Sequence, residues 1–164
     1  MRKNNKISII LLSVLFVAVF AFVVPLIVFP VRKIPQYEMY ETVAEVRAFL
    51  ETEAQDVTDE GQDPYLGSRE TSDSLNVSFT YGGKRFSLSA HVFVSAEDCR
   101  EYYAAKSGYA SDAESNATAN TYYLSATYYA YDGSRSFCLT GSDYLMFTNL
   151  ISAMNEAQGG TENV

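Results

Sequence analysis

The sequence predicts an α+β domain that follows an N-terminal membrane-spanning helix. Three observations lead to this prediction: an apolar N-terminal run, two pairs of alternating strand patterns, and a helical pattern after each pair. Two strand–strand–helix units predict a four-stranded antiparallel sheet with both helices packed on one face. The 164-residue chain leaves room after the apolar run for one small domain.

The apolar run, residues 7–29, holds 23 residues without a charged side chain. As a helix it would reach about 34 Å, enough to cross the roughly 30 Å hydrocarbon core of a bilayer. The apolar region of a secretory signal is only about 7–15 residues long. We therefore expect an uncleaved transmembrane helix from Ile7 to Phe29. The alternative is cleavage after Ala21 and secretion of the remainder.

Charge predicts the orientation of this helix. Three basic residues lie within residues 1–6 and two follow the span, so the positive-inside bias favours a cytoplasmic N-terminus and an extracytoplasmic C-terminal domain. After Lys33 the chain carries 20 acidic and seven basic side chains, a net charge of −13. A charge of this sign disfavours nucleic acid and anionic membrane surfaces as partners of the soluble part.

Two segments separate the span from the predicted domain. Residues 30–55 are predicted to form a juxtamembrane amphipathic helix, because apolar residues recur there at helical spacing opposite a glutamate-rich face. This helix would be a stalk or an element packed on the domain. Residues 56–73 are polar, acidic and interrupted by Gly and Pro, which is typical of a linker.

The domain itself is predicted over residues 74–157. Strands 75–81 and 84–94 are joined at Gly82-Gly83, and a helix follows, capped by Ser95 and ended by Gly108. After a surface loop at 109–120, the pattern repeats with strands 121–131 and 135–140 and a last helix capped by Ser142. Residues 158–164 are expected to be a disordered tail.

Tyrosine use suggests where a ligand would bind. The chain has 13 Tyr and no Trp, and strand alternation places several polar and aromatic side chains on the sheet face away from the predicted core. Tyr, Ser and His are amphipathic residues that recur in recognition surfaces. The predicted ligand or partner surface consists of Tyr123, Tyr129, Tyr131, His91 and Ser89. The alternative is that another element, such as the juxtamembrane helix, simply covers this face.

Cys99 and Cys138 could form one disulfide in an oxidising compartment. Side-chain parity opposes the bond, because Cys99 should point at the sheet from its helix whereas Cys138 should point away from the core face. The alternative is two small, buried free thiols.

The sequence offers little for catalysis or metal binding. With His91 as the only histidine, a Cys99–His91 pair has no supporting motif, and His91 is expected at the surface. A calcium-loop pattern that begins at Asp56 has Gly67 where the bidentate Glu should be. We expect no enzyme activity, no metal and no cofactor.

Together these patterns predict a single-pass membrane protein with a small, non-catalytic extracytoplasmic binding domain. Its partner would be another envelope protein or a cell-surface ligand. One alternative is a structural subunit of a membrane complex, assembled through the span and the juxtamembrane helix. A hydrolase is the third hypothesis.

Overall fold

The computed structural model describes residues 34–108, 115–119 and 125–159. The predicted span and Tyr123 lie outside the described residues. Residues 34–164 form one compact unit. Among the helices of the described part, none is both long and apolar enough to cross a bilayer.

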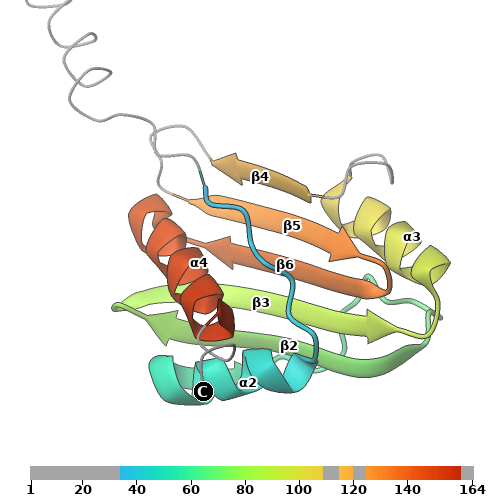
Figure 1. The fold of residues 1–164 in the computed structure, drawn as a ribbon, viewed down its shortest axis with the longest axis horizontal. Helices are drawn as coiled ribbons and strands as arrows, with labels where there is room; N and C mark the ends of the chain where they lie inside the picture. The colour runs from blue at the N-terminus through green and yellow to red at the C-terminus, as the bar shows by residue number, and fades with distance from the viewer. Residues whose placement is uncertain (1–33, 109–114, 120–124, 160–164) are drawn as a thin grey trace, which may run out of the picture. The chain divides into compact units, whose positions relative to one another are not determined.

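The centre of the unit is an antiparallel sheet (Figure 1), which confirms the α+β class. The described residues contribute six strands rather than the predicted four, in the order β1-β2-β3-β6-β5-β4. The two extra strands are the edge strands, found where the sequence predicts a linker and a surface loop. The strands are β1 (Gln55–Asp59), β2 (Thr71–Tyr81), β3 (Lys84–Phe93), β4 (Ser115–Ala119), β5 (Ala126–Asp132) and β6 (Arg135–Gly141).

The central strands follow from local sequence. Gly82 and Gly83 have φ of 55° and 73°, the left-handed values that a two-residue hairpin turn requires, and they pair Tyr81 with Lys84 across β2 and β3. The chain then leaves β3 through a helix, reaches the far edge at β4, and returns through β5 to place β6 beside β3.

Three helices accompany the sheet in the described residues: α2 (Val43–Glu53), α3 (Ala96–Ser107) and α4 (Tyr144–Gly159). The predicted caps of α3 are confirmed, since Ser95 accepts a hydrogen bond from the Asp98 amide and Gly108 ends the helix with φ 71°. The cap of α4 is Asp143 rather than the predicted Ser142, because its carboxylate accepts from the Met146 amide at 3.0 Å. α4 also extends through Gly159, into the predicted tail.

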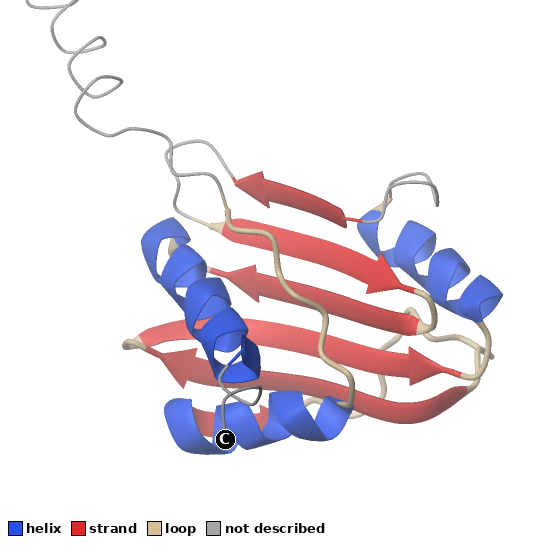
Figure 2. Ribbon diagram, viewed as in Figure 1, coloured by secondary structure: helices blue, strands red, loops and turns tan. Residues whose placement is uncertain are grey.

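The helices lie on both faces of the sheet, so the prediction of one helical face is wrong. Phe86 and Leu88 of β3 share the larger core with α2 and α4, which cross the near side of the sheet in Figure 2. Phe93, at an odd-numbered position of β3, packs instead with Cys99 and Tyr102 of α3. Side chains alternate between faces along a strand, so α3 covers the opposite face.

The juxtamembrane segment belongs to the domain. Its predicted helix is shorter than expected, because the chain is extended before α2 and crosses over β5 and β6 (Figure 1). Tyr37 stacks on Phe137 with ring centroids 3.9 Å apart. The Tyr40 hydroxyl donates to the Ser136 carbonyl at 2.7 Å. The apolar residues of α2 are buried in the same core, so α2 is a packed element rather than a free stalk.

Candidate binding groove and buried polar network

A groove of about 1130 Å³ lies between α2 and α4. Its accessible apolar lining consists of Ala48 and Ala157, which are exposed, and Met39 and Ala153, which are partly exposed. Beneath them lie the buried side chains of Val46, Phe49 and Met154. The rim of the groove is acidic. The rim carboxylates are Glu38, Glu41, Glu45, Glu53 and Glu156.

The rim is negative without local compensation. The described residues that line the groove include no Lys or Arg, and none of the five rim glutamates forms an ion pair with another described residue. Glu45 has a structural role as well, because it accepts hydrogen bonds from the Thr42 hydroxyl at 2.9 Å and the Glu41 amide at 3.1 Å at the start of α2. The other four rim side chains are exposed at the groove edge.

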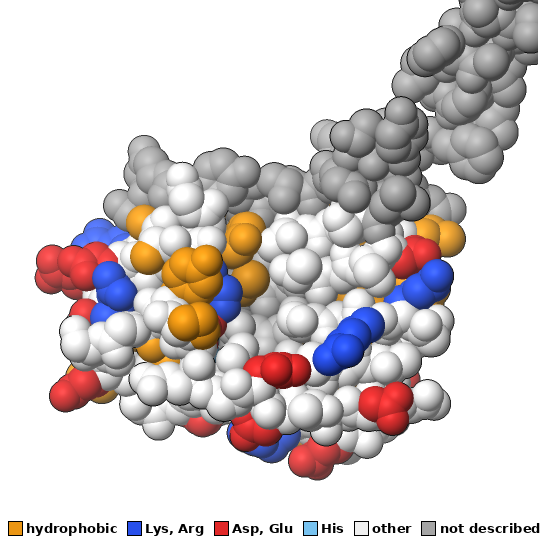
Figure 3. All heavy atoms as spheres, turned by 180° about the vertical axis from the view of Figure 1, so that it is seen from behind, with side chains coloured by type: hydrophobic (Ala, Val, Ile, Leu, Met, Phe, Trp, Pro, Cys, Tyr) orange, Lys and Arg blue, Asp and Glu red, His pale blue; other side chains and the backbone are white. Residues whose placement is uncertain are grey.

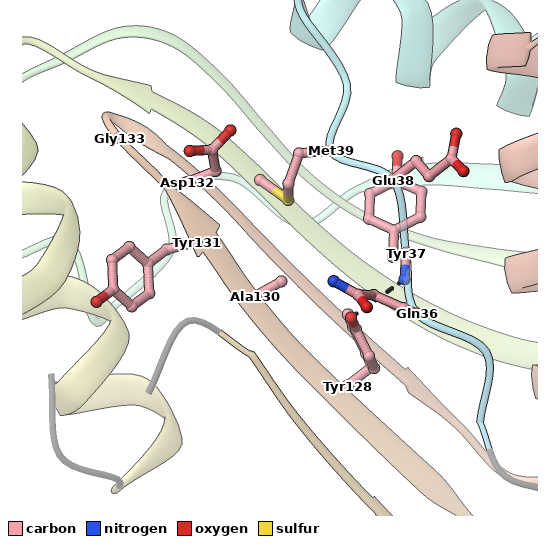
Figure 4. Close-up of a pocket in the computed structure, with 9 residues that line it drawn as sticks. All are labelled: Gln36, Tyr37, Glu38, Met39, Tyr128, Ala130, Tyr131, Asp132 and Gly133. Carbon is pink, nitrogen blue, oxygen red and sulfur yellow. Dashed lines mark hydrogen bonds between the residues drawn. The ribbon is translucent and has the colours of Figure 1, made fainter. Parts of the chain in front are cut away.

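A second groove, of about 550 Å³, lies on the other side of the extended segment (Figure 4). Residues 36–39 form one wall, and the end of β5 with its turn forms the other. Tyr37 and Tyr128 line it, but each is only 3% exposed, and the Tyr128 hydroxyl accepts from the Tyr37 amide at 3.1 Å. Tyr131, which is half-buried, also lines this groove. Because the other two rings are committed to the core, the groove offers a ligand little aromatic surface.

The predicted Tyr-bearing surface is largely covered. His91 is 0% exposed and Ser89 is 6% exposed, so their expected surface position is wrong. Tyr129 and Tyr131 are half-buried, and the Tyr131 ring contacts Tyr103 of α3 with centroids 4.9 Å apart. Figure 3 shows the molecule from behind, where charged side chains of both signs are scattered, unlike the uniformly acidic rim.

Beneath α3 the structure brings together a buried polar network that the sequence did not predict. Asp63 is 1% exposed, and its carboxylate accepts from the Tyr102 hydroxyl at 2.7 Å, the Tyr65 amide at 3.0 Å and the Lys106 ammonium. The oxygen that accepts from Tyr102 and Lys106 is Oδ2, and it also lies 3.4 Å from His91 Nε2. The interactions of Asp63 thus join β3, α3 and the segment that precedes β2.

The network indicates which nitrogen of His91 donates to Asp63. Burial alone would raise the pKa of Asp63, but hydrogen bonds from His91, Lys106 and Tyr102 outweigh it and hold that pKa well below its usual value. An ionised carboxylate only accepts, so His91 Nε2 carries the proton and donates to Asp63. In the neutral imidazole, His91 Nδ1 is then the acceptor for the Ser74 hydroxyl, 2.8 Å away.

Ser74, His91 and Asp63 therefore form a relay in the order found in serine hydrolases. Two observations argue against a hydrolase site here. Neither groove is lined by these three side chains. The Ser74 amide, which could serve an oxyanion, donates instead to the Asp73 carboxylate at 2.8 Å. The arrangement is better explained as a structural network that fastens α3 and the segment around Asp63 to the sheet.

Sequence reasoning missed Asp63 and Lys106 because they lie 43 residues apart, in a predicted linker and at a helix end. Lys106 also donates to Ser89 Oγ at 2.7 Å, which explains why a serine can be buried there. No group of three or more His, Cys, Asp or Glu side chains in the described residues could hold a metal ion.

Both cysteines are buried and are free thiols in this structure. Burial, with a smaller contribution from the Asp132 charge, raises the pKa of Cys99 to about 12. Burial raises the pKa of Cys138 to about 11. The parity argument against a disulfide relied on a single helical face. Because α3 covers the face opposite Phe137 and Leu139, Cys138 points toward the same layer as Cys99.

The fold and the groove define an antiparallel α+β domain with a concave acidic surface between two helices. Searches against protein-family models, curated proteins and solved structures found no match, so no relative supplies an activity for this site.

Proposed function

We propose that the chain is a membrane-tethered, non-catalytic interaction protein whose extracytoplasmic domain binds another envelope protein in the groove between α2 and α4. The observation that carries this proposal is the groove itself, with its apolar lining and its unpaired glutamate rim. Concave surfaces with an apolar floor and a few convergent polar groups are the usual sites of recognition.

The tether supports a role close to the bilayer. Four residues, 30–33, separate Phe29, the last residue of the proposed span, from Ile34, the first described residue of the domain, so the chain takes five steps between the two. An extended chain covers at most about 3.6 Å per residue, so this connection reaches at most about 18 Å. A domain on so short a tether would meet its partner at the membrane surface.

The structure favours this proposal over assembly through a free stalk. α2 packs on the domain core through its apolar residues, so it does not stand apart from the domain as a stalk. A hydrolase is less well supported, because the Ser74 relay lines neither of the two grooves described above and the Ser74 amide donates to the Asp73 carboxylate.

Site-specific photo-crosslinking in native membranes tests the proposal. A photoreactive residue at Ala48 of the full-length chain would lie in the groove, whereas the same residue at Ala44, also exposed on α2, would lie outside its lining. We expect a discrete adduct with one envelope protein from position 48 and none from position 44. Equal adducts from both positions, or none from either, would refute the groove as the binding site.

The orientation has its own test. Protease added to intact cells should digest residues 34–164 and leave the N-terminus protected. Protection of the domain until the cells are lysed would refute the extracytoplasmic placement.

A further inference from the structure

The chemistry of the groove narrows the class of its occupant. We propose that the α2–α4 groove binds a basic amphipathic helix of the partner protein. This inference rests on the function proposed above and adds the sign of the partner's charge and its secondary structure.

Charge is the first argument. Five glutamates surround the apolar lining, no basic side chain lies among the described lining residues, and no described residue forms an ion pair with the five. The chain after Lys33 has a net charge of −13, so the long-range field has the same sign as the rim. Complementary charge would speed the encounter with a basic segment and reject an acidic one.

Shape is the second argument. The groove lies between α2, of 11 residues, and α4, of 16 residues, and its volume of about 1130 Å³ lies at the upper end of the range for small-molecule pockets, about 1,000 Å³. Exposed small residues on both helices, Ala48 of α2 and Ala157 of α4, leave room for an apolar stripe at i, i+3, i+4 and i+7 of a third helix. Met39, which is partly exposed, adds a side chain that adapts to different apolar partners.

Other occupants fit less well. A second copy of the chain would bring the same glutamates against this rim, and like charges in contact cost several kcal/mol. A small apolar ligand would leave the rim without a role. An anionic lipid surface would be repelled by the five carboxylates.

Peptide binding to the full-length chain in nanodiscs of zwitterionic lipid tests the inference, with empty nanodiscs to subtract membrane binding. The probe is a labelled Leu/Lys peptide of about 18 residues, five helical turns, with Leu at the core-facing positions. A scrambled Leu/Lys peptide and a Leu/Glu peptide of the same pattern serve as comparisons. We expect saturable binding of the patterned basic peptide alone, measured by fluorescence anisotropy.

Matched variants locate the binding. The triple change Glu41→Gln, Glu53→Gln and Glu156→Gln removes three rim charges without touching the Glu45 cap. The control triple, Glu60→Gln, Glu70→Gln and Glu97→Gln, removes three exposed charges elsewhere. The rim triple should lower the affinity for the basic peptide about tenfold, and the control triple should lower it less than about twofold, because screened charge acts mainly at contact distance.

A steric pair completes the design. Ala48→Trp should obstruct the groove beside α2 and strongly weaken peptide binding, whereas Ala44→Trp should leave peptide binding unchanged. Equal weakening by both glutamate triples, or equal binding of the Leu/Glu peptide, would overturn the inference. Self-association of the chain that Ala48→Trp abolishes would identify a second copy as the occupant and would also overturn it.

Failure of this inference is distinguishable from failure of the proposed function. A position-48 adduct in native membranes that persists in the rim triple would retain the groove as a binding site and reject a basic partner. Absence of any adduct at position 48 would reject the groove function itself.

Discussion

Replacing Lys106 by Met should destabilise the domain by about 3 kcal/mol. Lys106 is 13% exposed and its ammonium donates to Asp63, which is 1% exposed. Removing one partner of a buried ion pair leaves an uncompensated charge and costs about 3–5 kcal/mol. The partial exposure of Lys106 and the donors that Asp63 retains, Tyr102 and the Tyr65 amide, place the expected cost at the lower end.

Methionine is the informative replacement because it keeps most of the lysine stem. The Lys106 ammonium lies 5.4 Å from the Tyr102 ring centroid, so an Ala substitution would remove packing together with charge. Urea unfolding of the fragment 34–164, one compact unit, can be followed by tyrosine fluorescence because the chain has no Trp. Heating should show a midpoint lowered by about 10 °C, from roughly 4 °C per kcal/mol.

Lys84→Met is the matched control. Lys84 lies 3.4 Å from Asp143, but the two side chains are 48% and 31% exposed, so breaking this surface pair should cost less than about 1 kcal/mol. The double variant Asp63→Asn with Lys106→Met should cost less than the sum of the single changes by about 1 kcal/mol or more, since the residues are in contact. Equal effects of Lys106→Met and Lys84→Met would refute the assignment of Asp63–Lys106 as a buried pair.

Three further predictions follow from the same network and its surroundings. The folded-state pKa of Asp63 is lowered. The ionised carboxylate therefore stabilises the fold above the unfolded-state pKa of about 3.9, and this stabilisation is lost progressively as pH falls below that value. The urea midpoint should fall less between pH 7 and pH 3 in the Asp63→Asn variant than in the parent protein. Ser74→Ala should lower the free energy of unfolding in urea by about 1–3 kcal/mol, because it removes the hydroxyl that pairs with Nδ1 of buried His91. A fluorophosphonate probe should leave Ser74 of the parent protein unlabelled, and labelling would support the hydrolase hypothesis. Cys99 and Cys138 should react with a thiol reagent only after unfolding, because both are buried and their pKa values are raised to about 12 and 11; no reaction even after unfolding would show a disulfide.

Local patterns predicted the centre of the fold well. Alternation along Leu75 to Tyr81 and along Phe86 to Phe93, with the Gly82-Gly83 turn, identified the β2–β3 hairpin. The α3 caps were also readable, because Ser95 and Gly108 act through bonds within a few residues. The edge strands could not be predicted in this way. β1, for example, is exposed along its whole length and has no apolar alternation.

The side of the sheet that α3 covers required information that strand alternation does not contain. The buried positions of α3 are Cys99, Tyr102 and Tyr103, a weakly apolar stripe with hydroxyl groups. Such a stripe suits a sheet face that carries Ser89 and His91, because the Tyr102 hydroxyl finds a partner there in Asp63. The signal was therefore the chemical match between a tyrosine-bearing helix and a polar strand face.

The candidate groove could not be predicted because tertiary contacts build it. The extended segment that contributes Glu38 and Met39 is fixed by α4: Asn155 accepts from the Glu38 amide at 3.0 Å and donates to the Gln36 carbonyl at 2.8 Å. These two hydrogen bonds join residues that are separated by 117 and 119 positions along the chain. A glutamate-rich helix read alone predicts a solvated stalk. Once the apolar side of this helix is packed on the sheet and α4 lies beside it, the same glutamates form the rim of a groove. The site therefore depends on the tertiary structure and not on the composition of the helix alone.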